Sequence, residues 1–243
     1  MLIEYGNTAT LYNWHLDERQ ATGYSRIYYA YSGEVEYESG GQITRFRPGY
    51  LYILPSTQPY TARRATREDF VCTYMHISFF EAHVTRLITV RPEEGSCLFY
   101  YLKTVRHCIS EGRTELLELL ADAFDQFLKG DPAYVRASEM QNTVQQYIRG
   151  HISEEVKIED LSRLFSYHPN YFIRIFRQET GYTPHQFLLQ QRMQYAVALL
   201  TRGLGNQEIC DACGYTDSNT FTRAFRQYYG VTPQKYKNGY RRP

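Results

Sequence analysis

The sequence of 243 residues contains no hydrophobic run of the roughly 18–20 residues that a membrane-spanning helix needs. Its first ten residues lack a basic stretch followed by an apolar one, so we expect no secretory signal. Tryptophan occurs once, and the five cysteines are an odd number in a chain long enough to build its own core. These absences argue against a membrane protein or a disulfide scaffold and favour a reduced, cytoplasmic protein.

Histidine is absent from residues 16–75. Metalloenzymes built on small β-barrels need several histidines and a carboxylate that converge, and the seven histidines here lack such spacing. No glycine-rich phosphate loop, activated serine or pair of catalytic carboxylates stands out. Cys210 and Cys213 have the internal spacing of zinc ligands, but no second pair of ligands lies near them, so we expect buried thiols. The sequence therefore predicts no metal, no cofactor and no catalytic activity.

The sequence also lacks a strong excess of positive or negative charge, since it contains 27 Lys and Arg and 26 Asp and Glu. Residues 1–136 carry a net charge of −3 and residues 137–243 a net charge of +4. This split is compatible with two units that have different partners, and also with chance, because +4 is far below the charge of a strongly basic nucleic-acid domain. The positions of the arginines must therefore decide between these two explanations of the charge split.

An internal repeat is present in the second half. Residues 170–184 and 219–233, which are 49 positions apart, are identical at nine of fifteen positions. Chance gives about one identity at ordinary residue frequencies of roughly 5–7%. Two copies are too few for a solenoid, so the repeat marks a paired module.

Each copy predicts an amphipathic helix with phenylalanines on its apolar face. The opposite face holds one asparagine and two arginines in each copy: Asn170, Arg174 and Arg177 in the first, and Asn219, Arg223 and Arg226 in the second. Shorter amphipathic segments, 157–167 and 205–215, precede the two helices across short turns. This is the helix-turn-helix pattern, in which the second helix enters the DNA major groove and arginine reads guanine while asparagine reads adenine. The alternative is a surface helix whose arginines are only solvated. It would explain this face in one copy better than its recurrence in both copies.

A further helix is predicted between the copies, over residues 184–202. Its about 19 residues span roughly 28 Å at 1.5 Å per residue. Successive major grooves on one face of DNA are roughly 34 Å apart, so one chain can read two of them.

Residues 137–242 resemble the DNA-binding domain of AraC/XylS-type transcription regulators. The stretch 209–237 keeps most of the family's second signature, with mild departures at Cys210, Tyr215 and Lys237. The positions kept are Ile209, Gly214, Phe221, Phe225, Gly230, Thr232, Pro233 and Tyr236. The first motif is similar in register at Leu161, Phe176, Gly181 and Arg192.

This resemblance implies a bundle of about seven helices, at about 137–150, 158–165, 169–179, 184–202, 206–213, 217–228 and 233–240. It also implies base-reading positions, which are Asn170, Ile173 and Arg174 in the first motif and Ser218, Asn219, Thr222 and Arg223 in the second. Ile173 is apolar where a polar reader is common, so it touches a thymine methyl or reads nothing.

Residues 1–80 predict short strands, because Val35 and Tyr37 alternate with glutamates and Ser39-Gly40-Gly41 forms a hairpin-type turn. Such spacing suggests a small barrel or jelly roll. The layout is similar to the cupin-like sensor domain that precedes many AraC-type DNA-binding domains. We therefore predict an α+β chain with a β-barrel or jelly-roll domain with helices over 1–130, a linker over 131–136 and an all-α DNA-binding domain over 137–243.

Tyrosine is abundant, with 24 residues, and those in the front half could line an effector pocket. The candidate lining residues are Arg26, Tyr28, Tyr37, Arg45, Tyr52 and Tyr60. Sugars and other small organic ligands suit tyrosine walls, and the arginines suit an anion. Core and surface tyrosines of ordinary strands explain the pattern equally well.

Two helices are predicted after the strands, at about 97–110 and 114–128. The second has an apolar stripe at helical spacing, formed by Leu116, Leu117, Leu120, Phe124 and Phe127. The stripe either packs on the barrel or forms a dimer face, and both can hold.

Together these features predict a sequence-specific transcription regulator whose front domain senses a small molecule, a sugar being one candidate, or mediates dimerisation. The expected partners are double-stranded DNA, the effector, a second copy of the chain and RNA polymerase, with no membrane. The alternatives are a regulator that needs no ligand and a cupin-type sugar-modifying enzyme, which stoichiometric metal in purified protein would favour.

Overall fold

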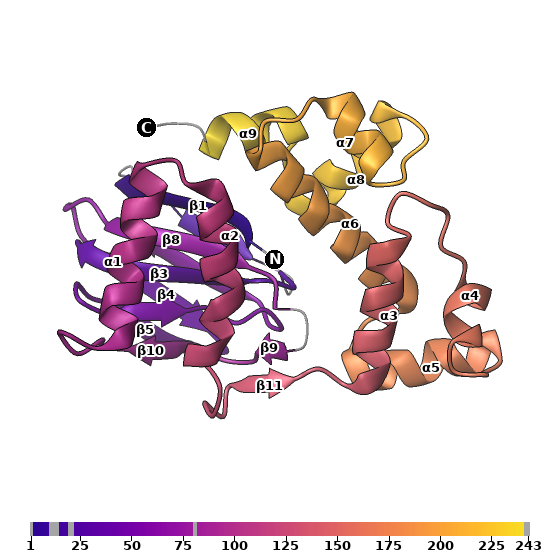
Figure 1. The fold of residues 1–243 in the computed structure, drawn as a ribbon, viewed down its shortest axis with the longest axis horizontal. Coiled ribbons are helices and arrows are strands. Elements are labelled where there is room, and N and C mark those ends of the chain that lie inside the picture. The colour runs from indigo at the N-terminus through magenta and orange to yellow at the C-terminus, as the bar shows by residue number, and fades with distance from the viewer. Residues whose placement is uncertain (1, 10–14, 19–21, 80–81, 241–243) are drawn as a thin grey trace. The chain divides into compact units, whose positions relative to one another are not determined.

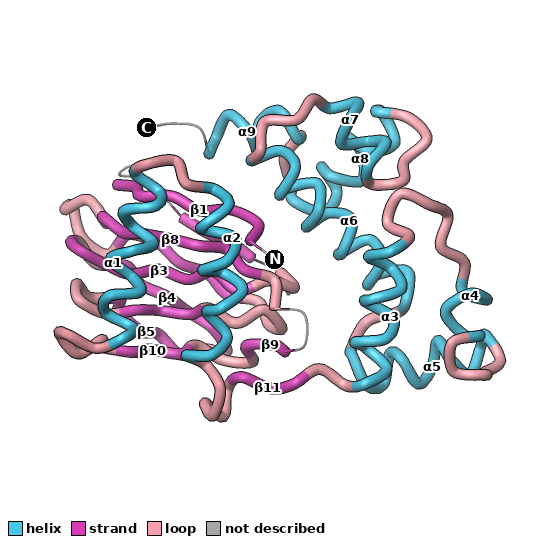
Figure 2. The backbone as a smooth tube through the Cα atoms, in the orientation of Figure 1, coloured by secondary structure: helices cyan, strands magenta, loops and turns pink. Residues whose placement is uncertain are grey.

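The computed structural model describes residues 2–9, 15–18, 22–79 and 82–240. The chain forms two compact units, Met1–Arg136 and Ala137–Pro243 (Figure 1). Strands and two long helices make up the first unit, and helices make up the second (Figure 2). The α+β class with a β-rich front half and a helical back half is therefore confirmed.

Over the described residues, the first unit contains two larger antiparallel sheets and a third sheet of two strands. The five-stranded sheet has the order β1 (Leu2–Ala9), β8 (Val71–Ile77), β3 (Ser25–Ser32), β6 (Leu51–Ile53) and β10 (Ile88–Val90). The four-stranded sheet has the order β2 (His15–Glu18), β7 (Tyr60–Arg64), β4 (Val35–Ser39) and β5 (Gln42–Phe46). Tyr28 and Tyr52 of the first sheet share one buried cluster with Tyr37 and Phe46 of the second. The two sheets therefore pack face to face around a largely aromatic core.

The hairpin between β4 and β5 follows the sequence prediction. Gly40 and Gly41 have φ of +57° and +76°, and Ser39 pairs with Gln42 across them. A two-residue hairpin turn requires positive φ at both central positions, which glycine adopts without strain. Val35 and Tyr37 point into the core as their alternation predicted.

Two helices cover the other face of the five-stranded sheet, α1 (Cys97–Ser110) and α2 (Thr114–Ala123), which Figure 2 shows side by side. The predicted helix over 114–128 ends as a short 3₁₀ turn, η1 (Phe124–Phe127). Ile27 and Met75 of the sheet share a core with Val105 of α1 and Leu117 of α2. Burial of this apolar surface holds the helices on the sheet.

The segment 131–136, predicted as a linker, contains a strand of the first unit. Strand β11 (Tyr134–Arg136) pairs with β9 (Ala82–Val84), and the Thr85 N–H donates to the Ala133 carbonyl at 2.9 Å. Glycine and proline at 130 and 132 suggested a free connection, but they only form the turn that leads into the strand. Pairing with a strand some 50 residues earlier leaves no local pattern in the sequence.

The second unit consists of helices over the residues that the structure describes. They are α3 (Glu139–Gly150), α4 (Ile158–Arg163), α5 (Pro169–Thr180), α6 (Pro184–Thr201), α7 (Asn206–Ala212), α8 (Ser218–Tyr229) and α9 (Pro233–Tyr240). Each lies within about two residues of its predicted bounds, which is the usual uncertainty of a helix end. Within the described ranges, no helix is long and apolar enough to cross a membrane.

Candidate nucleic-acid interface

The first helix-turn-helix motif consists of α4 and α5. Between them the chain turns at Ser166, which has a left-handed φ of +55°, and the Tyr167 N–H donates to the Ser162 carbonyl at 3.0 Å. The His168 side chain caps α5 through a long contact of 3.4 Å from the Asn170 N–H. Pro169 follows as the first helical residue, where its missing N–H costs nothing. The turn therefore sets the direction in which α5 leaves α4.

The apolar face of α5 anchors the helix and leaves the opposite face to solvent. Phe172 and Phe176 are fully buried among residues of α3, α4 and α6. The side chains predicted to face DNA lie on the other side: Asn170, Arg174 and Arg177 are exposed, and Ile173 is half-buried. The Arg174 guanidinium lies 5.1 Å from the centre of the Tyr171 ring. The structure thus brings the predicted reading residues of the first motif together on one face.

The second motif, α7 and α8, has a stronger helix cap. Asp217 Oδ1 accepts hydrogen bonds from the N–H groups of Asn219 at 2.9 Å and Thr220 at 2.8 Å. The Thr220 hydroxyl donates to Oδ2 at 2.7 Å. These hydrogen bonds, that of the Thr220 hydroxyl first, hold the pKa of Asp217 below its usual value. Phe221 and Phe225 are fully buried, so α8 is anchored as α5 is.

The outer face of α8 repeats that of α5. Asn219, Arg223 and Arg226 are exposed, and Ser218 and Thr222 are half-buried. The Ser218 hydroxyl donates to Gln207 Oε1 at 2.8 Å, so this residue also joins α8 to α7.

Helix α6 joins the two motifs and is well specified at its start. Thr183 and Gln186 form a reciprocal capping box, and Pro184 occupies the first helical position. Most of the side chains of α6 are buried, which is typical of a central helix. The motifs are therefore carried by one packed element within the second unit.

Arg192 of α6 links the loop before α4 to the turn of the second motif. Its Nη2 donates to the Glu154 carbonyl at 2.5 Å, and its guanidinium lies 5.7 Å from the centre of the Tyr215 ring. At Gly214, with φ of +70°, an added Cβ would lie 2.7 Å from this Nη2 and 2.9 Å from the Ile152 carbonyl oxygen. In the sequence, Arg192 and Gly214 mark only positions of the family motifs, and their proximity follows from the packing of α6 beside this turn.

Cys210 and Cys213 lie in this core, as the sequence predicted. Both are buried and free, and burial raises the pKa of the Cys213 thiol to about 12. Among the residues that the structure describes, no three His, Cys, Asp or Glu side chains are grouped as metal ligands would be.

In the first unit, the predicted ligand residue Arg26 is buried in a polar network at one end of the space between the sheets. It donates to the hydroxyls of Tyr60 at 2.8 Å and Tyr24 at 3.0 Å, and it pairs with Glu18 at 2.5 Å. Nearby, His76 Nδ1 lies 3.0 Å from a Glu4 oxygen, and burial lowers the pKa of His76 despite that carboxylate.

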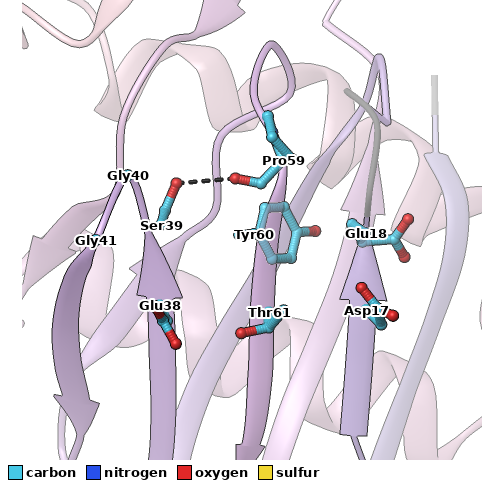
Figure 3. A pocket seen from close by; sticks show the side chains of 9 residues that line it. All are labelled: Asp17, Glu18, Glu38, Ser39, Gly40, Gly41, Pro59, Tyr60 and Thr61. Atoms are coloured by element: carbon cyan, nitrogen blue, oxygen red, sulfur yellow. Dashed lines mark hydrogen bonds between the residues drawn. The ribbon is translucent and has the colours of Figure 1, made fainter.

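A hollow of about 250 Å³ opens beside this network (Figure 3). Its lining includes three carboxylates and three hydroxyls and contains no lysine or arginine: Asp17, Glu18, Glu38, Ser39, Gly40, Gly41, Pro59, Tyr60 and Thr61. Glu18 and Tyr60 line the hollow and also contact Arg26. Carboxylate and hydroxyl oxygens give the hollow mostly hydrogen-bond acceptors.

The other predicted ligand residues are not brought to this hollow. Tyr28, Tyr37 and Tyr52 are buried between the sheets, where Tyr52 stacks on Phe46 with ring centres 3.8 Å apart. Arg45 faces outward with 58% of its side chain exposed, because β5 alternates and residue 46 takes the inward position. Arg45 therefore lies away from the hollow and from the buried tyrosines, and its contact with an anionic ligand stays a prediction.

The predicted dimer stripe on α2 and η1 is divided by the structure. Leu117 and Phe124 are fully buried and Leu120 is half-buried against the sheet, so these positions serve the core. Leu116 and Phe127 remain exposed at 41% and 39%. The centre of the stripe therefore packs on the sheet, as one of the two alternatives expected, and only its rim stays exposed, so the dimer face remains a prediction for Leu116 and Phe127.

Comparison with known proteins agrees with this geometry. Residues 161–239 match a family described as a helix-turn-helix domain. YobQ of Bacillus subtilis, named as an HTH-type transcriptional regulator, is 22% identical over 222 residues, which cover 88% of this chain and 86% of YobQ. The Msm operon regulatory protein of Streptococcus mutans is 28% identical over 126 residues, 51% of this chain and 45% of that protein.

Among solved structures, unsaturated fatty acid-bound ToxT from Vibrio cholerae has a TM-score of 0.69 and 10% identity. The match covers 96% of this chain and 94% of ToxT. At this identity the similarity concerns the fold.

Proposed function

We propose that the chain is a DNA-binding transcription regulator of the AraC/XylS type, in which α5 and α8 read successive major grooves on one face of double-stranded DNA. The duplicated outer face supports the proposal most, because the same exposed asparagine and two arginines recur on both helices. Helix α6, with 18 residues, has a length of about 27 Å. That length suits two readers on neighbouring groove turns.

The chemistry of each side chain suggests its role. Asn170 and Asn219 can pair with adenine, and Arg174 and Arg223 with guanine. Arg177 and Arg226, one turn further along the helices, are placed to meet phosphates, which position the protein without reading sequence. Ile173 and Thr222 offer methyl groups to thymine, and Ser218 supports the start of α8.

Selection from a random DNA pool at near-physiological salt tests this proposal. We expect an enriched motif of two boxes about 10–10.5 base pairs apart, since that is one helical turn of DNA. The salt concentration is held constant, because phosphate contacts make the DNA affinity depend on it. A motif with one box would contradict reading by both helices. If no motif appears with or without candidate ligands, sequence-specific binding itself is wrong.

We also propose that the first unit binds a small polyhydroxylated effector, such as a sugar, at the hollow beside Arg26. Carboxylates and hydroxyls accept hydrogen bonds from sugar hydroxyls, while no cation lines the hollow to neutralise an acid. A carbohydrate therefore fits this hollow better than a fatty acid of the kind bound to ToxT.

Thermal unfolding with panels of sugars and fatty acids checks the effector class. A ligand that binds only the folded chain at 100 times its Kd raises stability by about 2.7 kcal/mol. We expect a sugar to do so, and Glu38→Gln, which keeps the shape of the hollow, to weaken the response. The outward Glu94→Gln is the matched control and should respond as wild type. A response to fatty acids alone would contradict the carbohydrate assignment.

We further propose a homodimer that acts in the cytoplasm and contacts RNA polymerase, with the effector shifting the population of DNA-binding arrangements. Leu116 and Phe127 are the predicted dimer residues that remain exposed on the helices of the first unit. Sedimentation of wild type and Leu116→Lys checks the dimer, and we expect the variant to dissociate at a higher concentration. Identical behaviour of the two would move the interface elsewhere.

A further inference from the structure

A series of aromatic contacts leads from the core of the first motif to its reading face. The buried Phe172 ring stacks with Phe165 at 5.7 Å, and Phe165 stacks with Tyr167 at 6.1 Å. Tyr167 meets Tyr171 edge-on at 5.0 Å. Tyr171 in turn lies beneath the Arg174 guanidinium, 5.1 Å from ring centre to guanidinium carbon. The Tyr171 ring is thus held by neighbours that are themselves fixed to the core.

Tyr171 is nevertheless 43% exposed, although tyrosine has a large apolar ring. At 100° per residue it lies 60° from Arg174 around the helix axis, beside the face that carries Asn170 and Arg174. Because the Tyr171 ring is exposed beside Arg174, a ligand that contacts the Arg174 guanidinium also contacts this ring. Its contact with a guanidinium within 6 Å is a favourable cation–π geometry and restricts the arginine before DNA arrives.

The second motif has no such ring beside its reading arginine. The repeat places Thr220 at the position of Tyr171, and the Thr220 hydroxyl is engaged by the Asp217 cap. The tyrosine of the second turn, Tyr215, lies against Arg192 inside the unit. The two reading helices therefore differ in the surroundings of their central arginines, Arg174 and Arg223.

We propose, resting on the DNA-reading function above, that Tyr171 is a specificity residue of α5: its ring holds Arg174 toward a guanine and contacts the methyl group of a thymine next to that guanine. Apolar side chains read thymine through its C5-methyl group, and arginine reads the guanine edge beside it in the same groove. The box read by α5 then requires a thymine beside its guanine, and the box read by α8 has no such requirement.

Replacing that thymine by deoxyuridine tests the proposal, because deoxyuridine differs only by the missing methyl group. The full chain is used on the selected DNA at one salt concentration, and the guanine read by α5 is identified as the position that Arg174→Ala relaxes. Wild type should lose about threefold to fivefold in Kd on the deoxyuridine duplex, the size expected for one buried methyl group. Tyr171→Phe keeps the ring and should behave as wild type.

Tyr171→Ala should bind the thymine duplex several-fold more weakly and no longer distinguish thymine from deoxyuridine. The same replacement in the α8 box should change nothing. Tyr100→Ala, which truncates a tyrosine that is 59% exposed on α1, is the matched control and should bind as wild type. Unchanged thermal unfolding of Tyr171→Ala would show that the helix remains folded.

Several results would overturn the assignment while leaving DNA reading intact. They are a selected α5 box without thymine beside the guanine, equal sensitivity to deoxyuridine in wild type and Tyr171→Ala, or tighter binding by Tyr171→Ala. Failure of wild type to select any sequence would instead overturn the proposed function and this inference with it.

Discussion

The two helix-turn-helix motifs have similar cores and differ in the turns that lead to their second helices. In both, two phenylalanines of the second helix are fully buried and the helix ends at a left-handed glycine, Gly181 or Gly230. The N–H of the tyrosine that follows the left-handed turn residue donates back five residues in each case, at 3.0 Å. The common core therefore reproduces the same helix pair twice.

The turns themselves are not equivalent. The left-handed residue is Ser166 in the first motif, two positions before the cap His168, and Gly214 in the second, three positions before Asp217. The first turn is thus one residue shorter, carries strain at a non-glycine residue and ends in a weaker cap. The comparison teaches that the buried phenylalanines specify the helix pair, while the turns vary.

The largest expected effect concerns the buried phenylalanines of the two motif cores. Phe176→Ala and Phe225→Ala should each lower the free energy of unfolding by about 3–5 kcal/mol, because each removes a fully buried aromatic ring. Urea unfolding followed by circular dichroism measures both. A loss below about 1 kcal/mol in one motif would show that the two cores are not equivalent.

The second effect separates the reading faces. Arg174→Ala and Arg223→Ala should each cost about 1–3 kcal/mol of binding to the selected DNA and relax one base position, in different boxes. Binding titrations on base-substituted duplexes measure this. Equal losses of binding free energy on unrelated DNA would show that both arginines contact phosphates and do not read bases.

An exchange of the turn residues comes next. Gly214→Ser should lower the free energy of unfolding by about 2 kcal/mol, since a left-handed L-residue costs roughly 1–2 kcal/mol and the new Cβ meets Arg192 and the Ile152 carbonyl. Ser166→Gly should raise it by up to about 1 kcal/mol, because glycine relieves the strain but loses more entropy on folding. Equal and small effects of the two changes would contradict the difference between the turns.

The smallest effect is expected at the caps. Because the pKa of Asp217 is lowered in the folded chain, its stabilisation is fully present above the ordinary aspartate pKa of about 3.9 and is lost as pH falls through the folded value. Asp217→Asn keeps a capping oxygen, so its stability should fall less than that of wild type between pH 6 and pH 3. Exposed Asp211→Asn is the control. If the free energy of unfolding changed with pH in parallel for wild type and Asp217→Asn, the Asp217 cap would not be a source of the pH dependence.

Much of the helical unit could be predicted because its signals are local. The helical period and the glycine after the last residue are contained within a dozen residues, so α5 and α8 lie within two residues of their expected bounds. The same periodicity indicated which of their side chains face outward. Strands with close turns, such as β4 and β5, were predictable for the same reason.

The remaining features depend on partners distant in sequence. The strand within residues 131–136 and the outward direction of Arg45 follow from register with other strands, which no local pattern shows. The network of Arg26 with Glu18 and Tyr60 joins three strands, and its members have no common spacing.

Local periodicity in the amino-acid chain was thus enough to specify two amphipathic helices and their outer faces, because a helix repeats every 3.6 residues whatever surrounds it. The placement of Arg192 beside the Gly214 turn and the burial of Leu117 arose only when separate elements packed together. Such contacts depend on shape across tens of residues, and no short stretch of sequence encodes that shape.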